Sequence, residues 1–254
     1  MDTRYLALSM SDKVATVTID RPDKGNSLSP QVLGEIADTF AELSERDDIN
    51  VIMLTGGEKM FSAGFDLDYI KTIDKADNEE FTAIFHRAYR SILFCDQPVI
   101  AAVGGPAIAG GFDLTLMCDI RYASERAKFG QREVALSLNP LLDPLWRIIG
   151  LGPAKELALT GRIIDAEEAF RLGYVSKVFP EGKVVEAVTE IARSMASYDR
   201  ATLVETKQLS INVLDQGLDA AMKTQEWLFR SFIGSDDNKT RIDSLLESLK
   251  KRSK

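Results

Sequence analysis

Hydrophobic and polar positions change their spacing along the chain, and these changes predict the secondary structure. Alternation of Ala15, Val17 and Ile19 with threonines predicts a half-buried strand. Further strands are predicted over 51–55, 98–103, 119–124 and 174–179. Helices are predicted over about 30–46, 66–73 and 78–94. The first has Ser29 as N-cap and Pro30 at its first position. A further helix is predicted to begin after its cap Asp165 and to end at Gly173. Strands and helices therefore alternate over the first 180 residues, which predicts an α/β core with mostly parallel strands.

The last part of the chain has only the helical spacing. Helices are predicted over 184–196, 200–213, 217–232 and 236–251. Their apolar positions, Leu209 and Trp227 among them, must be buried on the core or on a neighbouring subunit. No linker rich in Pro, Gly or Ser separates the two parts. We therefore predict a core over 1–180 and a helical extension over 181–254 that form one continuous domain.

Composition narrows the possible functions. The 31 Lys and Arg residues against 39 Asp and Glu leave a net charge of −8, which argues against nucleic-acid and membrane partners. A single histidine, His86, and two cysteines, Cys95 and Cys118, exclude a metal site with several histidines and a disulfide framework. Residues 1–12 lack the apolar stretch of a signal peptide, and the apolar stretch 98–112 is broken by glycine and proline. A cytoplasmic protein without a metal site is expected.

Two loops rich in small residues follow strands and precede helices. They are FSAGFDL at 61–67 and GGPAIAGG at 104–111. Small residues allow a ligand to approach the main chain, and the start of a helix leaves several N–H groups unpaired. Two such groups aimed at one carbonyl oxygen would form an oxyanion hole. The loops lack the spacing of dinucleotide and phosphate loops, and the alternative is that they are turns only.

Five segments, in order, resemble the crotonase (enoyl-CoA hydratase/isomerase) superfamily. They are DRPDKGNSLS at 20–29, AGFDL at 63–67, PVIAAVGGPAIAGGFDLTLMCDIRYAS at 98–124, AKFGQREVALSLNP at 127–140 and GPAKELALTGRIIDAEEAFRLGYVSKVFP at 152–180. The resemblance covers roughly residues 10–230. It implies an α/β fold, a spiral of ββα units followed by C-terminal helices that mediate trimers. A homotrimer or a dimer of trimers is therefore expected.

The resemblance also implies a substrate and the groups that bind it. The substrate would be an acyl-CoA thioester, with no cofactor because CoA is part of the substrate. The thioester carbonyl would lie between the backbone N–H groups of Phe65 and Gly110. The CoA moiety would run along two segments, contacting Lys24, Ser27, Leu28, Ser62, Ala63, Gly64, Asp66 and Leu67. The net negative charge then requires local cations for the CoA phosphates, such as Arg21 and Lys24.

Two carboxylates correspond to the catalytic pair of the family. Hydratases of the family use two glutamates that hold a water over the substrate double bond; the matching residues here are Asp113 and Glu133. Asp113 departs from the pattern, because an aspartate withdraws the carboxylate by roughly 1.5 Å. Dienoyl-CoA isomerases of the family also have an Asp and a Glu here. Without the motif, Asp113 would be explained by its place in the first turn of a helix and Glu133 by an exposed loop.

A second departure follows Pro140. Leu141, Asp143 and Trp146 stand where hydratases have a glycine-rich stretch, so we expect them to reshape and narrow the acyl pocket. Asp143 is interpreted as an N-cap with Pro144 at the first helical position; the alternative is a third acid in the site. His86 is interpreted as a helix-surface or packing residue. The alternative is a catalytic His86, which would favour a hydrolase.

Hydration of a 2-enoyl-CoA to a 3-hydroxyacyl-CoA is the function that these residues favour, with Asp113 and Glu133 as the acid/base pair. Three alternatives stay open: an enoyl- or dienoyl-CoA double-bond isomerase, an acyl-CoA hydrolase, and a non-catalytic crotonase-like protein that binds CoA esters.

Overall fold

The computed structural model describes residues 3–74, 78–213 and 216–252. The chain divides into two compact units, Met1–Ser197 and Tyr198–Lys254. The boundary that the sequence suggests, between residues 180 and 181, stays a prediction. Among the described residues, none of the helices has both the length and the apolar character needed to cross a bilayer.

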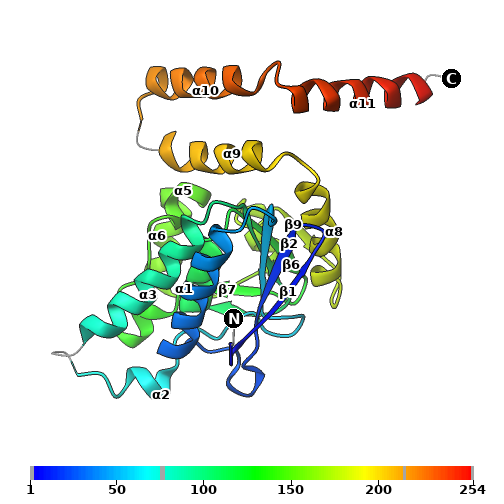
Figure 1. Ribbon diagram of the computed structural model, residues 1–254. Coiled ribbons are helices and arrows are strands. Elements are labelled where there is room, and N and C mark those ends of the chain that lie inside the picture. Colours follow the sequence, from blue (N-terminus) through cyan, green and yellow to red (C-terminus); the bar gives the residue numbers. More distant parts are fainter. Residues whose placement is uncertain (1–2, 75–77, 214–215, 253–254) are drawn as a thin grey trace. The chain divides into compact units, whose positions relative to one another are not determined.

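A six-stranded sheet forms the centre of the first unit (Figure 1). Its strands, in spatial order, are β1 (Leu6–Ser11), β2 (Val14–Ile19), β3 (Val51–Thr55), β4 (Val99–Val103), β6 (Ile120–Ser124) and β9 (Lys177–Phe179). Only β1 and β2 are antiparallel, and every other neighbouring pair is parallel. All residues of β3 and β4 are buried, as expected for parallel strands covered on both faces. The predicted α/β core with a mostly parallel sheet is confirmed.

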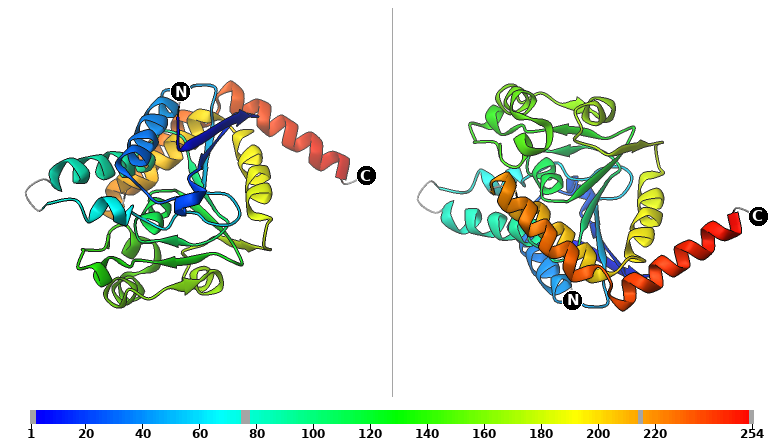
Figure 2. Two further views of the ribbon diagram at one scale, coloured as in Figure 1. Left: turned by 90° about the horizontal axis from the view of Figure 1, so that it is seen from below. Right: turned by 90° about the horizontal axis from the view of Figure 1, so that it is seen from above.

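Helices cover both faces of this sheet. Figure 2 shows α8 (Val184–Ala196) on one side and α1 (Pro30–Ser44) with α3 (Asn78–Leu93) on the other. The predicted N-cap of α1 is confirmed, because Ser29 accepts a hydrogen bond from the Val32 N–H at 3.4 Å. The Asn50 side chain donates to the Ala196 carbonyl at 2.8 Å, so the end of α8 is held by the residue that precedes β3.

A smaller sheet carries the site-bearing loops. Its strands are β5 (Ala107–Ile108), β7 (Lys128–Gly130) and β8 (Ile164–Asp165). The helices α4 (Gly110–Leu116) and α7 (Ala166–Arg171) contact this sheet, and α5 (Leu145–Ile149) packs against α6 (Leu151–Thr160). Asp165 caps α7 as predicted, by accepting from the Glu168 N–H at 2.9 Å.

Two predicted boundaries need correction, and one strand was missed. The helix predicted over 66–73 is only α2 (Leu67–Ile70), and the strand predicted over 174–179 is only β9. Tyr174 instead packs its ring on Phe112, with centroids 4.9 Å apart. Strand β1 was not predicted, because its exposed positions carry Ala, Ser and Met and give no clean alternation.

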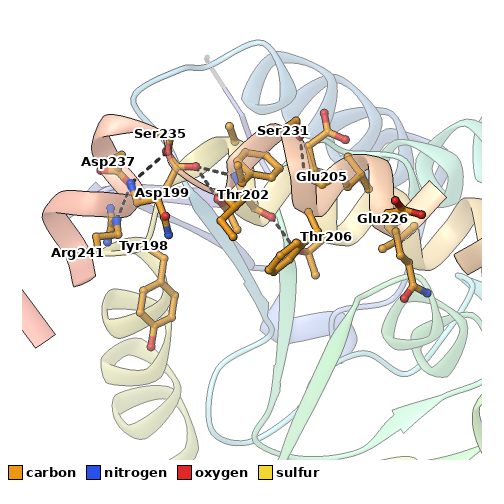
Figure 3. A pocket seen from close by; sticks show the side chains of 18 of the residues that line it. Tyr198, Asp199, Thr202, Glu205, Thr206, Glu226, Ser231, Ser235, Asp237 and Arg241 are labelled. Atoms are coloured by element: carbon orange, nitrogen blue, oxygen red, sulfur yellow. Dashed lines mark hydrogen bonds and ion pairs between the residues drawn. The ribbon is translucent and has the colours of Figure 1, made fainter. Parts of the chain in front are cut away.

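The second unit is helical. It contains α9 (Arg200–Asn212), α10 (Leu218–Phe232) and α11 (Asp236–Arg252), which confirms the predicted helices over these segments. Asp199 caps α9 by accepting from the Thr202 N–H at 2.8 Å. Figure 3 shows a hollow lined by Tyr198 and by residues of these helices, Thr202, Glu226 and Arg241 among them. None of the site residues proposed from the sequence lines it.

Candidate active site

Three chain segments that are far apart in sequence lie side by side at the site. Leu28 forms a parallel bridge with Phe65, and Ser62 forms one with Ala107. The Leu28 N–H donates to the Gly64 carbonyl at 2.8 Å, and the Ile108 N–H donates to the Ser62 carbonyl at 3.0 Å. The two proposed CoA-binding segments are thus adjacent to each other and to the chain that enters α4.

Glycine is required where these segments meet. Gly64 has φ +95°, and a Cβ there would lie 2.7 Å from the Ile108 carbonyl oxygen and 3.3 Å from the Gly110 nitrogen. Gly64 and the Gly110 N–H are therefore close neighbours. Ala109 has φ +51°, a left-handed value that turns the chain into α4. This turn places the first N–H of the helix beside the 62–67 segment.

The backbone N–H groups of Phe65 and Gly110 are free for a ligand. Neither donates to any group among the described residues. The first N–H groups of a helix have no partner within it, which explains Gly110. The bridge between Leu28 and Phe65 uses the Gly64 carbonyl and the Asp66 N–H, so the N–H between them stays unpaired. An oxyanion hole needs two fixed donors on adjacent segments, and that role for Phe65 and Gly110 stays a prediction.

The Phe65 ring supports this arrangement. A Cβ on Gly110 would lie 3.1–3.2 Å from three atoms of that ring. The ring also packs against Phe81 and Phe85 of α3, with centroids 5.2 and 5.6 Å apart. The Phe65 side chain therefore packs between α3 and the start of α4.

Asp113 lies in the first turn of α4, three residues after Gly110. Its side chain is buried, and Gln131 Nε2 donates to Asp113 Oδ1 at 3.2 Å. Burial and then the nearby Glu133 raise the pKa of Asp113 well above its usual range, although hydrogen bonds from Gln131 and Tyr89 favour the ionised form. Asp113 therefore keeps its proton to a higher pH than an exposed aspartic acid.

Glu133 begins a short 3-10 helix, Glu133–Leu136. Its side chain is buried, and among the described residues neither carboxylate oxygen has a hydrogen-bond partner. Burial raises the pKa of Glu133, against a smaller opposing effect of its own backbone N–H. A buried carboxyl without a partner is costly, and such groups are concentrated at functional sites. Together with Asp113 it forms a pair of buried acids, a suitable arrangement for proton transfer.

The residues proposed to contact CoA have two different environments. Lys24, Ala63 and Leu67 are exposed, whereas Ser27, Leu28, Ser62, Gly64 and Asp66 are buried. Ser62 Oγ donates to the Asn26 carbonyl at 2.8 Å and accepts from the Gly64 N–H at 3.2 Å, so it holds the two segments together.

The basic residues of this region are already paired with acids. Arg21 Nη1 lies 2.7 Å from Asp66 Oδ2 and also donates to Ser27 Oγ at 3.0 Å. Burial opposes ionisation of Asp66, but hydrogen bonds from Arg21 and from backbone N–H groups lower its pKa below the usual value. Lys24 is exposed, with its Nζ 3.4 Å from Asp68 Oδ2. Lys24 is thus more accessible to a ligand than Arg21.

The segment after Pro140 differs from the prediction. Asp143 is not the N-cap of α5, which begins at Leu145 after Pro144 and has no side-chain cap. Arg147, one turn later, competes for the carboxylate: its Nε donates to both oxygens of Asp143, at 2.8 and 3.1 Å. The Leu141 carbonyl accepts from Gln131 Nε2 at 2.6 Å, and Trp146 remains 37% exposed. Roles for Leu141, Asp143 and Trp146 toward an acyl group stay predictions.

His86, Cys95 and Cys118 stay apart from these groups. His86 is exposed on α3, which confirms the helix-surface interpretation. Both cysteines are buried and neither is part of a disulfide; the Cys95 thiol donates to Gln97 Oε1 and the Cys118 thiol to the Leu114 carbonyl. In the part of the chain that the structure describes, no cluster of three or more His, Cys, Asp or Glu side chains is suited to hold a metal ion.

Two site residues were missed by the sequence analysis, Tyr89 and Gln131. Gln131 could have been found, because it stands two residues before Glu133 in the same motif. Tyr89 lies at an apolar position of the α3 pattern, and nothing in its sequence neighbourhood separates it from a core residue.

Comparisons with known proteins identify the family and the fold. A sequence model of the enoyl-CoA hydratase/isomerase family matches residues 9–253. The chain is 32% identical over 254 residues to the short-chain-enoyl-CoA hydratase of Clostridium acetobutylicum, covering 98% of this chain and 97% of that one. It is 32% identical over 249 residues to the crotonyl-CoA hydratase of Syntrophomonas wolfei, covering 96% of both. The crystal structure of an enoyl-CoA hydratase from Bacillus anthracis matches with a TM-score of 0.92 at 30% identity, covering 96% of this chain and 97% of that one. The chain therefore belongs to the enoyl-CoA hydratase/isomerase family and has the crotonase fold.

Proposed function

We propose that this protein adds water to the double bond of a 2-enoyl-CoA and forms a 3-hydroxyacyl-CoA. The observation that carries the proposal is the pair of buried carboxyl groups, Asp113 and Glu133, of which Glu133 has no partner among the described residues. Asp113 lies in the same first turn of α4 as Gly110. Glu133 follows β7, whose Gly130 carbonyl accepts from the Ala109 N–H at 2.8 Å. Relatives named as enoyl-CoA hydratases support the same reaction.

The proposed steps use each of these groups. The thioester oxygen accepts hydrogen bonds from the N–H groups of Phe65 and Gly110, which stabilise the negative charge that develops on it. One carboxylate accepts a proton from a water molecule whose oxygen bonds to C3 of the acyl group. The other carboxyl group gives a proton to C2, so that one water is added in total. Removing a single oxyanion donor typically costs about 10²–10³ in rate.

CoA would be bound by the segments that contain Lys24–Leu28 and Ser62–Leu67. Lys24 is exposed and available to a phosphate, whereas Arg21 is held by Asp66. The proposed reaction requires no cofactor, because the CoA thioester itself provides the electron-accepting carbonyl. The cytoplasmic location expected from the sequence stays a prediction.

Double-bond isomerisation is the second candidate, and the aspartate at position 113 favours it. The dienoyl-CoA isomerases that the sequence resembles also have an Asp and a Glu at these two positions, and such a pair can move a proton between two carbons without adding water. The two reactions have different products, so one experiment separates them.

The test is incubation of the protein with crotonyl-CoA and with longer enoyl- and dienoyl-CoA substrates, followed by mass spectrometry. Hydration gives a product heavier by one water, together with loss of the conjugated absorbance. A product of unchanged mass with a moved double bond would replace hydration by isomerisation, and release of free CoA would indicate a hydrolase. Binding of CoA esters without any product would indicate a non-catalytic protein.

The proposed assembly is a homotrimer or a dimer of trimers. Large apolar side chains of α10 support it, because Leu218, Met222 and Trp227 are 78%, 61% and 67% exposed in the single chain. Sedimentation equilibrium of the wild type and of Trp227→Glu tests this. A wild-type monomer at micromolar concentration would contradict the proposal.

A further inference from the structure

Tyr89 is a buried tyrosine whose hydroxyl group lies against the turn that carries the site. Its side chain is 4% exposed, and its ring packs against Phe85 with centroids 5.5 Å apart. The hydroxyl donates to the Gly110 carbonyl at 3.2 Å. Gly110 and Asp113 belong to the same first turn of α4, because the Asp113 N–H donates to the Ala109 carbonyl at 3.0 Å. Tyr89 therefore connects α3 to the turn that holds both the free N–H and the acid.

The hydroxyl of Tyr89 has one hydrogen, and two groups that can accept it belong to the first turn of α4: the Gly110 carbonyl and the Asp113 carboxyl. The Gly110 carbonyl is the acceptor at 3.2 Å, and the Asp113 carboxyl, in the same turn of α4, is near enough to raise the pKa of the hydroxyl. Burial and the charges of Asp113 and Glu133 raise the pKa of Tyr89 well above its usual value, so the hydroxyl keeps its hydrogen. A hydroxyl group can rotate, and it accepts as well as donates. It can therefore satisfy Asp113 whether Asp113 is ionised or protonated.

We propose that Tyr89 is the positioning residue of Asp113, with a hydroxyl that turns toward Asp113 when this acid is ionised and toward Gly110 when it is protonated. In the first state the hydroxyl donates to the carboxylate, a charge-assisted bond that is stronger than the bond to a neutral carbonyl. In the second state it accepts from the Asp113 carboxyl and donates to Gly110. The inference rests on the proposed acid/base function of Asp113.

Gln131 donates a hydrogen bond to Asp113 in both protonation states. Its Nε2 donates to Asp113 Oδ1 at 3.2 Å and to the Leu141 carbonyl at 2.6 Å, so both of its hydrogens are used. With Oδ1 accepting this bond, the proton that Asp113 exchanges is on Oδ2. The Gln131 amide thus holds the Asp113 carboxyl group in place, and the Tyr89 hydroxyl rotates when Asp113 gains or loses its proton.

The chain offers a matched control in Tyr174. Like Tyr89, Tyr174 is a buried tyrosine whose hydroxyl reaches α4, but its partner is Thr115 Oγ1. Both Tyr89→Phe and Tyr174→Phe remove one buried hydroxyl next to the same helix, so both are expected to lower the melting temperature. Asp113 affects the pKa of both tyrosines, but only Tyr89 is among the groups that shift the pKa of Asp113.

The pH dependence of enoyl-CoA hydration tests the inference in the active enzyme. Tyr89→Phe removes a group that favours ionised Asp113. The apparent pKa of Asp113 in the plot of kcat against pH therefore rises by about one unit. We expect kcat at neutral pH to fall by about tenfold and KM to change by less than about twofold. Tyr174→Phe leaves this apparent pKa unchanged. Equal profiles for the two variants would overturn the inference.

A second measurement is independent of activity, so failure of the proposed function and failure of this inference are distinguishable. Carboxyl carbons of aspartate are titrated by NMR in the free protein, with Asp113→Asn used for assignment. Tyr89→Phe is expected to raise the midpoint of the Asp113 signal, and Tyr174→Phe is not. In the wild type, the Tyr89 ring carbon that bears the hydroxyl should titrate with the same midpoint as Asp113. An Asp113 midpoint unaffected by Tyr89→Phe, or a Tyr89 signal that ignores Asp113, would refute the role even if the enzyme hydrates enoyl-CoA.

Discussion

Gln131 joins Asp113 to the segment that follows Pro140, because its Nε2 lies 3.2 Å from Asp113 Oδ1 and 2.6 Å from the Leu141 carbonyl oxygen. The acid and the predicted acyl-contacting segment are therefore coupled through a single amide group. A substitution in the 141–146 segment should therefore change the position of the Asp113 carboxyl group, and the reverse, because a hydrogen bond to a charged group is worth about 1.5–3 kcal/mol.

Gln131→Leu should lower kcat and alter the preference for acyl length. The variant keeps a similar side-chain volume but leaves the Leu141 carbonyl and Asp113 Oδ1 without their donor. A fall in kcat of about tenfold is expected from a misplaced acid, with a different ratio of kcat/KM for short and long enoyl-CoA substrates. Steady-state rates on a series of chain lengths measure both effects. A uniform loss at every chain length would argue against coupling to the 141–146 segment.

Glu133→Gln should abolish most of the activity without unfolding the protein. The amide has the same shape as the carboxyl group but cannot exchange a proton in the reaction, and general acid–base catalysis contributes about 10²–10⁴ in rate. Loss of the conjugated absorbance of crotonyl-CoA gives the rate, and circular dichroism reports the fold. Glu125→Gln, an exposed glutamate, is the control. Full activity in Glu133→Gln would remove Glu133 from the mechanism.

The main sheet and the long helices could be predicted because their signals are local. The runs at β3 and β4 are continuously apolar, and Ser29 followed by Pro30 marks a helix start that needs no tertiary information. Strands β5, β7 and β8 have only two or three residues each, which is too short for an alternating pattern to be recognised.

The candidate site was predictable only in part. Asp113, Glu133 and the two loops stand in motifs, so a resemblance locates them. The prediction that Asp143 is an N-cap was wrong. It used only the local pattern of an aspartate before Pro144, whereas in the folded chain the Asp143 carboxylate accepts from Arg147. Tyr89 could not be identified, since its importance comes from its contact with Gly110, 21 residues away.

Asp113→Asn should be more stable than the wild type near pH 8. Burial and Glu133 raise the pKa of Asp113 well above its ordinary value of 3.8. An acid with a raised pKa in the folded state loses its stabilising contribution as the pH rises from the unfolded pKa through the folded pKa. The neutral amide avoids this loss, so a gain of about 1 kcal/mol would raise Tm by about 2–4 °C.

The pH dependence is the decisive part of that prediction. Thermal melts at several pH values between 4 and 8 should show the advantage of Asp113→Asn shrinking as the pH falls toward the ordinary pKa of 3.8, because ionisation of Asp113 in the unfolded chain then decreases. An advantage that is equal at all pH values would show that packing, and not ionisation, separates the two proteins.

Arg21→Met should weaken CoA-ester binding and destabilise the fold. Arg21 and Asp66 are only 14% and 11% exposed, and breaking such a pair leaves a buried charge, at a cost of about 3–5 kcal/mol. Ser27 loses a donor as well, so the 24–28 segment should loosen and KM should rise more than kcat falls. Arg87→Met is a matched control, because its pair with Asp38 is exposed and is worth at most about 1 kcal/mol. Equal melting temperatures for the two variants would contradict this interpretation.

Gly110→Ala should impair the site through Phe65, and removal of the Phe65 ring should restore part of the loss. A Cβ at position 110 would lie 3.1 Å from the nearest atom of that ring, so the ring or the start of α4 must move. Either movement displaces a backbone N–H, and loss of one oxyanion donor costs about 10²–10³ in rate. Phe65→Ala keeps its own N–H and should cost less.

The double variant Phe65→Ala/Gly110→Ala tests whether the ring transmits the effect. If the clash displaces the N–H groups, the double variant is faster than Gly110→Ala alone, with a coupling energy within the range of about 0.5–3 kcal/mol typical of contacting residues. Rates on crotonyl-CoA and melting temperatures of all four proteins are compared, which separates the catalytic effect from the loss of packing against Phe81 and Phe85. Additive losses in kcat would mean that the added methyl group acts on the substrate directly and that Phe65 contributes only its backbone.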